Sequence, residues 1–335
     1  MITLVTGGAG YIGSHIVYNL IKLGNDVVVI DNLCRSKKIT LNKIEKLTKK
    51  KINFYKFDVN NFEKLEKFFQ EKNIKNVIHL AGLKSVSESI VKPAYYMKNN
   101  YEGSINLLNV MEKYNVYKLI FSSSATVYGE PIQLPITEEN PKNPLNPYGL
   151  SKSKVEDYMF NLSKDSEYWK FISLRYFNPL GLNLENFFSD FSLGKHQNIM
   201  PKLLKAYLNH DQYFEIYGND YDTKDGSGIR DYIHIDDLVE GHICALNHLE
   251  LIRGYETFNL GTGKGYSVYE LIKCFEKITK KKLRVKISPR RSGDTAELYA
   301  SSDKANKYLN WKPKKSLEAM VQSTINLVLK NEDLK

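Results

Sequence analysis

The stretch Thr6-Gly7-Gly8-Ala9-Gly10-Tyr11-Ile12-Gly13 decides the fold expected for this chain. It joins an apolar run that predicts a strand, residues 2–6, to an amphipathic run that predicts a helix, residues 11–23. Gly7 permits a tight turn, Gly10 lets the backbone approach a pyrophosphate, and Gly13 lets the helix pack close to the strand. The first N–H groups of the helix then point at the anion. The stretch therefore predicts a dinucleotide-binding turn.

Strands and helices alternate outward from this turn. Further strands are predicted at 26–30, 52–57, 76–80, 118–122 and 171–175, and helices at 37–50, 62–72, 93–114 and 148–161. Short apolar strands separated by helices are typical of a parallel sheet that is covered on both faces. We therefore expect an α/β protein in which residues 1–177 form a Rossmann-like, doubly wound parallel sheet that binds the dinucleotide.

The remaining residues, 178–335, show a looser pattern. Helices are predicted at 201–209, 236–249 and 267–279, and strands at 213–217, 257–260 and 283–287. Residues 131–147 and 178–201 lack periodicity and predict loops. This half is expected to be a smaller, mixed α/β lobe that binds substrate, because recognition groups commonly lie on loops.

Composition excludes several classes of protein. Of the 335 residues 42% are hydrophobic and 26% are charged, which is ordinary for a globular protein and excludes a disordered or fibrous one. The net charge of +10 comes from lysines spread over amphipathic segments, which indicates solvated helix faces rather than a nucleic-acid surface. No apolar run reaches the roughly 20 residues that span a bilayer. The chain starts with a strand, so we expect no leader peptide and a cytoplasmic protein.

The three cysteines, Cys34, Cys244 and Cys274, are far apart in the sequence. Their number and spacing favour neither a disulfide framework nor a zinc site. We therefore expect no bound metal.

Asp31 stands at the end of the second predicted strand, 18 residues after Gly13. A carboxylate at this place accepts hydrogen bonds from ribose hydroxyls and repels a 2′-phosphate, which favours NAD over NADP. Arg35 and Lys37 lie close by and leave NADP open as the alternative.

A second motif, Tyr148-Gly149-Leu150-Ser151-Lys152, begins the helix that follows a proline-rich loop. Tyr148 and Lys152 lie on one helix face because they are four residues apart. A nearby ammonium, together with a nicotinamide cation, is expected to lower the pKa of the phenol and make it a general base. Ser124 ends the fifth predicted strand, and its hydroxyl could join a sugar hydroxyl to the phenol. Tyr148, Lys152 and Ser124 are therefore the predicted catalytic residues.

Further motifs occur in order along the chain, at residues 5–15, 31–33, 79–84, 122–129, 148–152, 174–179, 217–221, 230–234 and 289–294. With these motifs the chain closely resembles the extended short-chain dehydrogenase/reductase family, in the branch that epimerises nucleotide sugars. The resemblance covers nearly the whole chain.

The resemblance implies roles for individual residues. NAD would be contacted by Gly7, Gly10, Tyr11, Ile12, Gly13, Asp31, Asn32, Asp58, Val59, Ala81, Lys84, Asn99, Ser124, Tyr148, Lys152 and Phe177. The UDP-sugar would be held by Asn178, Asn198, Ile199, Tyr217, Arg230, Tyr232, Arg291, Asp294 and Leu298. The chemistry agrees, because arginines form forked hydrogen bonds with a pyrophosphate, Tyr217 can lie along a uracil ring, and Asp294 can accept from a ribose hydroxyl.

The activity implied is the interconversion of UDP-glucose and UDP-galactose with retained NAD. The sugar would be oxidised at C4 to a 4-keto sugar, turn over, and be reduced on its other face. A homodimer that pairs through the helices at 93–114 and 148–161 is also implied.

Two other functions fit the same fold. A 4,6-dehydratase places an acidic pair directly after the serine or threonine that ends the strand, but here Ala125 and Thr126 follow Ser124. A non-catalytic NAD-sensing regulator could dispense with Tyr148 and Lys152, which are both present.

Leu298 corresponds to a position that, in the resembling family, helps to set the volume of the sugar pocket. Leucine is smaller than tyrosine but larger than cysteine or serine. We therefore expect weaker conversion of UDP-N-acetyl sugars than of UDP-hexoses. A register shift by one residue, which would put Tyr299 at this position, stays open.

Overall fold

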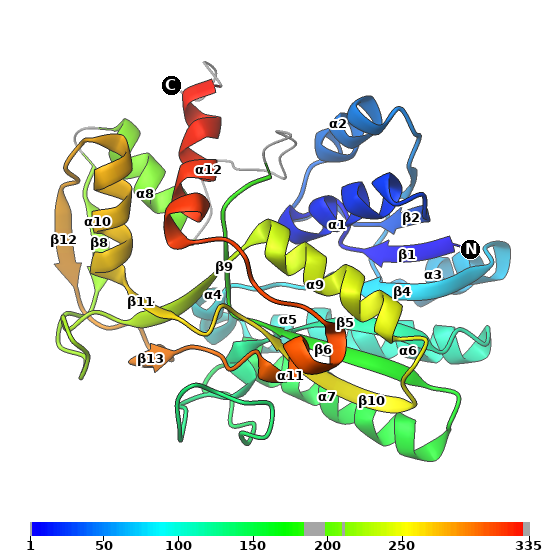
Figure 1. The fold of residues 1–335 in the computed structure, drawn as a ribbon. Helices are drawn as coiled ribbons and strands as arrows, with labels where there is room; N and C mark the ends of the chain where they lie inside the picture. Colours follow the sequence, from blue (N-terminus) through cyan, green and yellow to red (C-terminus); the bar gives the residue numbers. More distant parts are fainter. Residues whose placement is uncertain (1, 184–197, 210–211, 331–335) are drawn as a thin grey trace.

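The computed structural model describes residues 2–183, 198–209 and 212–330, and its large sheet is parallel throughout (Figure 1). The strands run in the order β10-β6-β5-β4-β1-β2-β3. They are β1 (Ile2–Thr6), β2 (Asp26–Ile30), β3 (Asn53–Tyr55), β4 (Ile74–His79), β5 (Lys118–Ser124), β6 (Lys170–Tyr176) and β10 (Gly254–Leu260). The order reverses between β1 and β4, and open parallel sheets bind ligands outside the carboxyl ends of strands at such a point. The predicted doubly wound sheet is confirmed.

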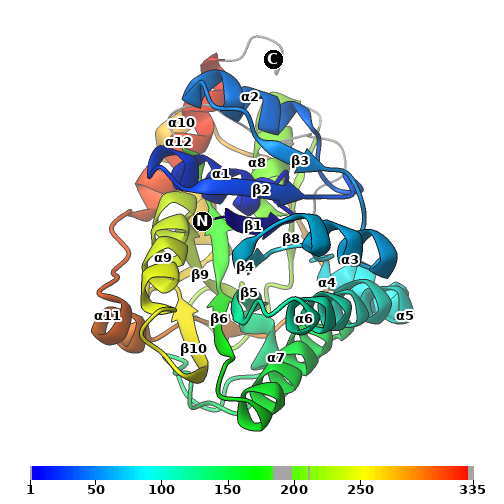
Figure 2. The same cartoon turned by 90° about the vertical axis from the view of Figure 1, so that its right-hand side faces the viewer.

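Helices cover both faces of this sheet, as Figure 2 shows. One face carries α1 (Tyr11–Lys22), α2 (Ile39–Thr48) and α9 (Ile235–His248), and the other carries α3 (Phe62–Glu71), α6 (Gly103–Lys113) and α7 (Pro147–Asp165). The neighbouring residues Leu4 and Val5 belong to different apolar cores, because successive side chains of a strand point to opposite faces.

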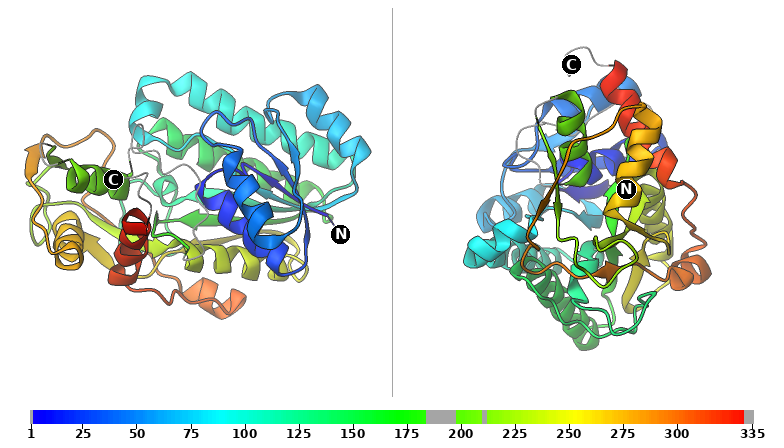
Figure 3. Two further views of the ribbon diagram at one scale, coloured as in Figure 1. Left: turned by 90° about the horizontal axis from the view of Figure 1, so that it is seen from above. Right: turned by 90° about the vertical axis from the view of Figure 1, so that its left-hand side faces the viewer.

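A smaller lobe follows the carboxyl ends of the large sheet (Figure 3). It is built around β9 (Ile229–His234), which pairs with β7 (Asn178–Leu180), β11 (Gly265–Ser267) and β13 (Glu297–Leu298). A separate pair consists of β8 (Phe214–Tyr217) and β12 (Val285–Ser288). The lobe also contains α8 (Ile199–Leu208), α10 (Val268–Thr279) and α12 (Leu317–Lys330), whose apolar side chains form a third core with β8. The short helix α11 (Asp303–Leu309) packs beside β10 and α9.

The predicted boundary at residue 177 does not coincide with the limit of the large sheet, because one strand of the sheet lies beyond it. β10 comes from the second half of the chain and pairs with β6 over its whole length. The helix α9, also from the second half, packs against α1 in the core of the first. That residues 1–177 bind NAD and residues 178–335 bind the UDP-sugar stays a prediction.

The helix predicted at 93–114 is a succession of three segments. It comprises α5 (Pro93–Tyr96), the π-helical stretch η1 (Met97–Glu102) and α6. A further helix, α4 (Val86–Val91), precedes them and was not predicted. π-helical turns frequently occur at functional sites. No helix in the described part of the chain is long and apolar enough to cross a membrane.

Candidate active site

The turn between β1 and α1 has the geometry of a phosphate-binding loop. Gly7 has a φ of +72°, and a Cβ there would lie 2.7 Å from the Ala81 nitrogen. A Cβ at Gly13 would lie 2.3 Å from the Gly7 oxygen. At Gly10 the only nearby atom is the Gly7 oxygen, at 3.3 Å. The protein therefore requires glycine at positions 7 and 13 and leaves the space beside Gly10 open, as a backbone that must approach a ligand needs.

The N-terminus of α1 lies at this turn, and the first N–H groups of a helix have no carbonyl partner within the helix. Gly10 provides no side-chain cap, and the first turn contains no acidic residue. The backbone N–H groups and the helix dipole therefore favour a phosphate here. Ile12 packs against the core beneath the turn, and the Tyr11 phenol donates a hydrogen bond to the Gly181 carbonyl at 2.5 Å. Tyr11 thereby connects the turn to the segment that follows β7. These features fit the pyrophosphate of a dinucleotide.

Polar side chains follow β2 and β3 at the same edge of the sheet. Asp31 accepts hydrogen bonds from the Ala9 amide at 3.1 Å and the Leu33 amide at 2.8 Å. Asn32 donates to Asp58 at 2.6 Å. Burial opposes ionisation of Asp58, but hydrogen bonds from Asn60 and Asn32 outweigh it and lower the pKa below its usual value. The Asp58 carboxylate is therefore ionised at neutral pH, and a negative charge here fits ribose hydroxyls better than a 2′-phosphate.

Arg35, one of the two residues on which the NADP alternative rested, is engaged with Glu88. Its Nη2 lies 2.7 Å and 2.9 Å from the two carboxylate oxygens of Glu88. This contact favours NAD further.

The other residues predicted to contact the cofactor lie in the loops that follow the strands and in the π-helical stretch η1. Val59 is buried after β3, and the Lys84 ammonium lies 5.9 Å from the Tyr11 ring centroid. Asn99, in η1, donates to Asn100 at 3.0 Å, and Phe177 is buried directly after β6. Together with Ala81, which packs against Gly7, they fit a dinucleotide extended along the carboxyl ends of the strands.

The predicted catalytic residues meet at the end of β5. Pro147 opens α7, and the Asn146 side chain caps it by accepting from the Gly149 amide at 2.9 Å. This cap fixes Tyr148 in the first turn, where the Ser124 side chain is close enough to act on the pKa of its phenol. One turn later the Lys152 ammonium donates to the Ser122 carbonyl at 2.7 Å. The three side chains therefore form one group around the last residues of β5.

Burial controls the protonation of this group. It lowers the pKa of Lys152 to about 7, although the charge of Glu156 raises it in part. Burial also raises the pKa of Tyr148 above its usual value, and the Ser124 side chain works in the other direction. The lowering predicted for the pKa of Tyr148 depends on the nicotinamide cation as well as on Lys152, so it stays a prediction for the NAD-bound protein.

A buried ion pair behind this group was not predicted. Glu156 lies one turn beyond Lys152 on α7 and accepts from Arg175 of β6 at 3.0 Å and 2.7 Å. Glu156 also accepts from Ser123, the residue before Ser124, at 2.5 Å. Both members of the pair are nearly inaccessible to solvent. The pair fixes α7 against β5 and β6, so we assign it a positioning role. In the sequence, the signal for this ion pair was Glu156, a carboxylate four residues after Lys152 and therefore on the same helix face.

Asn100 is a second positioning residue that was not predicted. Its side-chain oxygen accepts from the Leu83 amide at 2.8 Å. Its side-chain nitrogen donates to the Leu83 carbonyl at 2.9 Å and the Ser151 hydroxyl at 3.1 Å. The buried amide thus joins the loop after β4 to the helix that carries Tyr148. The available signal in the sequence was the pair Asn99 and Asn100, because two adjacent poor helix formers inside a predicted helix indicate that their side chains have another role.

The residues predicted to bind UDP gather around β9. Its Arg230 is paired in register with Leu298, and its Tyr232 with Asn178. The Arg291 guanidinium lies 4.8 Å from the Tyr217 ring centroid and forms an ion pair with Asp294 at 2.7 Å. Arg230 and Arg291 both act on the pKa of Tyr232. The structure therefore brings seven of the nine predicted residues together.

The other two, Asn198 and Ile199, begin α8. Ile199 packs against the core of the small lobe. Asn198 is the residue at which the described part of the chain resumes after residue 183. Lys202 of α8 was not predicted, but its ammonium lies 4.9 Å from the Tyr217 ring centroid.

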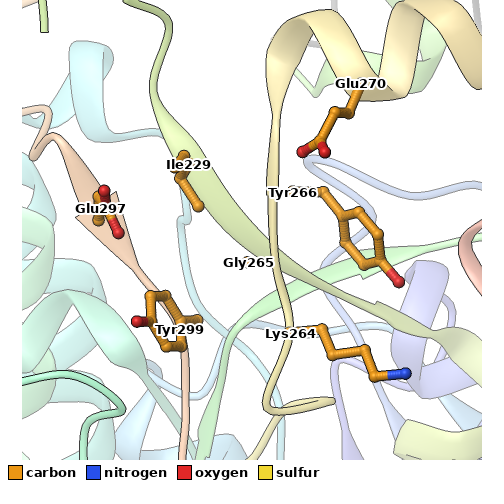
Figure 4. A pocket seen from close by; sticks show the side chains of 7 residues that line it. All are labelled: Ile229, Lys264, Gly265, Tyr266, Glu270, Glu297 and Tyr299. Carbon is orange, nitrogen blue, oxygen red and sulfur yellow. The ribbon is translucent and has the colours of Figure 1, made fainter. Parts of the chain in front are cut away.

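The structure also decides the register at Leu298. Leu298 is buried in a cluster with Ala125, Val127 and Phe177, which flank Ser124 and the end of β6. Tyr299 instead lines a different pocket, with Lys264, Glu270 and Glu297 (Figure 4). Leu298, and not Tyr299, therefore packs beside the residues that follow Ser124, and its role in the sugar pocket stays a prediction. Within the described residues, no group of three or more histidine, cysteine or acidic side chains could hold a metal.

A glycine-rich βα turn, an Asp after the second strand and a Ser-Tyr-Lys group on one sheet edge define an extended short-chain dehydrogenase/reductase. Residues 4–324 match the family model described as GDP-mannose 4,6 dehydratase. A UDP-glucose 4-epimerase of Arabidopsis thaliana is 43% identical over 98% of this chain and 95% of its own.

Two solved structures are also similar. The UDP-glucose 4-epimerase of Bifidobacterium longum, in complex with NAD⁺ and UDP, is 42% identical with a TM-score of 0.93, and all of both chains is covered. The enzyme of Stenotrophomonas maltophila, with NAD and formylated UDP-arabinopyranose, is 38% identical with a TM-score of 0.93 over 98% of each chain. The chain belongs to the UDP-glucose 4-epimerase family.

Proposed function

We propose that the protein interconverts UDP-glucose and UDP-galactose with a bound NAD. The observation that carries this proposal is the meeting of Tyr148, Ser124 and Lys152 at the sheet edge that also holds the glycine turn. The arginines and tyrosines around β9 supply cationic and aromatic groups suited to a nucleoside diphosphate. The NAD-bound relatives described above support the choice of cofactor.

Each residue has a defined task in this reaction. Tyr148 takes the proton of the sugar 4-hydroxyl, directly or through Ser124, and returns it later. The bound NAD accepts hydride from C4, so that a 4-keto sugar forms, and gives the hydride back on the opposite face. Lys152 stabilises the phenolate with its positive charge and holds the ribose next to the nicotinamide. Arg230 and Arg291 anchor the diphosphate while the sugar turns. Because one proton and one hydride leave and return, the cycle is redox-neutral.

The residues after Ser124 favour epimerisation over dehydration. Removing water across C5 and C6 requires an additional acid and base. Ala125 and Val127 are buried apolar residues, and Thr126 donates its hydroxyl proton to Ser124 at 2.9 Å. No carboxylate follows the strand directly.

The deciding experiment is product analysis by NMR after UDP-galactose is added to the purified protein without cofactor. Appearance of UDP-glucose supports the proposal. Formation of a 4-keto-6-deoxy sugar would instead indicate a dehydratase, and no conversion would indicate a regulator.

We further propose a cytoplasmic homodimer. The apolar residues Tyr95 on α5 and Leu150 and Phe160 on α7 are 47%, 41% and 43% exposed, and lie on the two helical segments expected to pair. Such exposed apolar groups favour contact with a second copy. The three cysteines are unpaired, as in reducing compartments. Sedimentation equilibrium tests the dimer.

We expect the purified protein to contain NAD already. A redox-neutral cycle never needs to exchange its cofactor, and the glycine turn, the Asp31 region and Lys152 hold it at both ends. The measurement is enzymatic assay of the nucleotide released by denaturation. Release of NADP, or an empty protein that requires millimolar NAD for activity, would contradict retention.

We expect Leu298→Tyr to abolish conversion of UDP-N-acetyl sugars and to spare the hexose reaction. The side chain lies in the cluster beside Ser124, so a larger ring there takes space that an N-acetyl group needs while the sugar turns. The measurement is kcat/KM for UDP-galactose and UDP-N-acetylgalactosamine. Tyr299→Phe, in the other pocket, is the control and should change neither value. Equal effects of Leu298→Tyr on both substrates would show that Leu298 is not the gate.

A further inference from the structure

We propose that the phenol of Tyr221 is a further binding group of the nucleotide-sugar site, which donates a hydrogen bond to the diphosphate of the bound UDP-sugar. This inference rests on the proposed function and adds a residue that the sequence did not indicate.

The first observation is that the Tyr221 hydroxyl has no partner. The residue is only 7% exposed, and its hydroxyl is buried without a hydrogen bond to any described residue. Buried polar groups in native proteins nearly always have a partner, so an unpaired one requires an explanation. A ligand oxygen that arrives with the substrate would provide the missing partner.

The second observation is that the ring is held firmly in place. The Arg290 guanidinium lies 4.2 Å from its centroid. Gly218 has a φ of +81°, and a Cβ there would lie 2.6 Å from the Tyr221 Cε2 atom. The Tyr221 amide donates to the Gly226 carbonyl at 3.0 Å. The ring therefore needs no rearrangement to present its hydroxyl, and binding costs little conformational entropy.

The third observation is the charge that surrounds the phenol. Burial raises the pKa of Tyr221, Asp294 raises it further, and Arg230, Arg290 and Arg291 lower it. The net effect is a raised pKa, so the hydroxyl keeps its proton at neutral pH and can donate it. Three guanidinium groups around one neutral donor indicate an anionic oxygen as the partner.

The carboxylate among these groups is already occupied. Asp294 accepts from Arg291 at 2.8 Å and takes no hydrogen bond from Tyr221. Arg230 donates to the carbonyls of Ile229 at 2.8 Å and Thr295 at 2.9 Å, which fixes its orientation. The cluster therefore holds its guanidinium groups in fixed positions, with Asp220 paired to Arg290 and Asp294 paired to Arg291, while the Tyr221 hydroxyl finds no acceptor among the described residues.

The test is Tyr221→Phe, which keeps the ring and removes only the hydroxyl. We expect the Kd for UDP, measured by calorimetry, to rise roughly 10- to 100-fold, the range for a lost hydrogen bond to a charged group. The Kd for uridine, which lacks phosphate, should stay unchanged. The Tm of the free protein should stay the same or rise, because the variant no longer buries an unpaired hydroxyl.

Tyr266→Phe is the matched control, since Tyr266 lies on β11 and lines the separate pocket in Figure 4. It should leave both dissociation constants unchanged. Unchanged UDP affinity in Tyr221→Phe would overturn the proposal, and so would an equal loss for UDP and uridine or a lowered Tm. Turnover of UDP-galactose by the unmodified protein tests the proposed function separately. A protein that binds UDP but does not epimerise UDP-galactose would refute that function. The role of Tyr221 would then be decided by UDP binding alone.

Discussion

Replacement of Tyr148 by phenylalanine should lower kcat by roughly 10²–10⁴-fold, the range typical of a general acid–base group, with little change in UDP affinity. The phenol acts at C4 of the sugar beside Ser124, whereas the nucleotide is held by the groups around β9. The measurements are the steady-state rate with UDP-galactose and the Kd for UDP.

Two further variants make this prediction specific. Lys152→Ala should be similarly slow, because the phenolate loses its ammonium. Ser124→Ala should be milder if Tyr148 reaches the 4-hydroxyl itself. Near-normal turnover of Tyr148→Phe would show that another group moves the proton.

Replacement of Arg175 by methionine should lower the free energy of unfolding by about 3–5 kcal/mol, because it removes the forked partner of the buried Glu156 carboxylate. Only the Ser123 hydroxyl and the Lys142 ammonium, at 3.4 Å, then remain beside it. Arg175 is 4% exposed and Glu156 is 1% exposed, so water cannot replace the lost hydrogen bonds. Denaturation by urea, followed by circular dichroism, measures the effect.

The matched control is the double variant Arg175→Met with Glu156→Gln. It removes both charges and should recover a large part of the lost stability. A loss below about 1 kcal/mol in the single variant, the range of an exposed ion pair, would mean that water reaches the pair.

The same pair should make stability depend on pH. Burial opposes ionisation of Glu156, but Arg175 and the other hydrogen-bonding partners hold its pKa below the usual value. For a carboxyl group with a lowered pKa, the stabilisation is complete above the unfolded value of about 4.3 and is lost as the pH falls through the folded value. The double variant should therefore lose less stability on acidification than the unmodified protein.

Local patterns explain what could be predicted from the sequence. The turn at residues 6–13 and the pair Tyr148 and Lys152 are short-range features, since their geometry follows from a few consecutive residues. The strands of the large sheet were predicted because a short run rich in apolar residues stands at each place. β10, with the polar residues Glu256, Thr257 and Asn259, was predicted only from residue 257. β13 has two residues and β7 has three, and these strands exist only because β9 pairs with them, so no local pattern indicates them.

Burial and distant contacts account for the rest. Glu156 and Arg175 lie on different elements, and only the packed structure shows that they meet. Burial raises the pKa of Tyr148 in the protein without cofactor, and this cost of burying a phenol cannot be read from its neighbours in the sequence. The unpaired hydroxyl of Tyr221 is likewise visible only once the loop between β8 and β9 is folded.

The position of β10 has a consequence for folding during synthesis. On the ribosome, β6 is complete well before β10 leaves the exit tunnel, so the nascent chain carries an open parallel edge for that interval. Unpaired edges are templates for association with other chains. A fragment that ends near residue 177 would keep this edge permanently, so it should need a chaperone or a complementing peptide that contains residues 254–260 to remain monomeric.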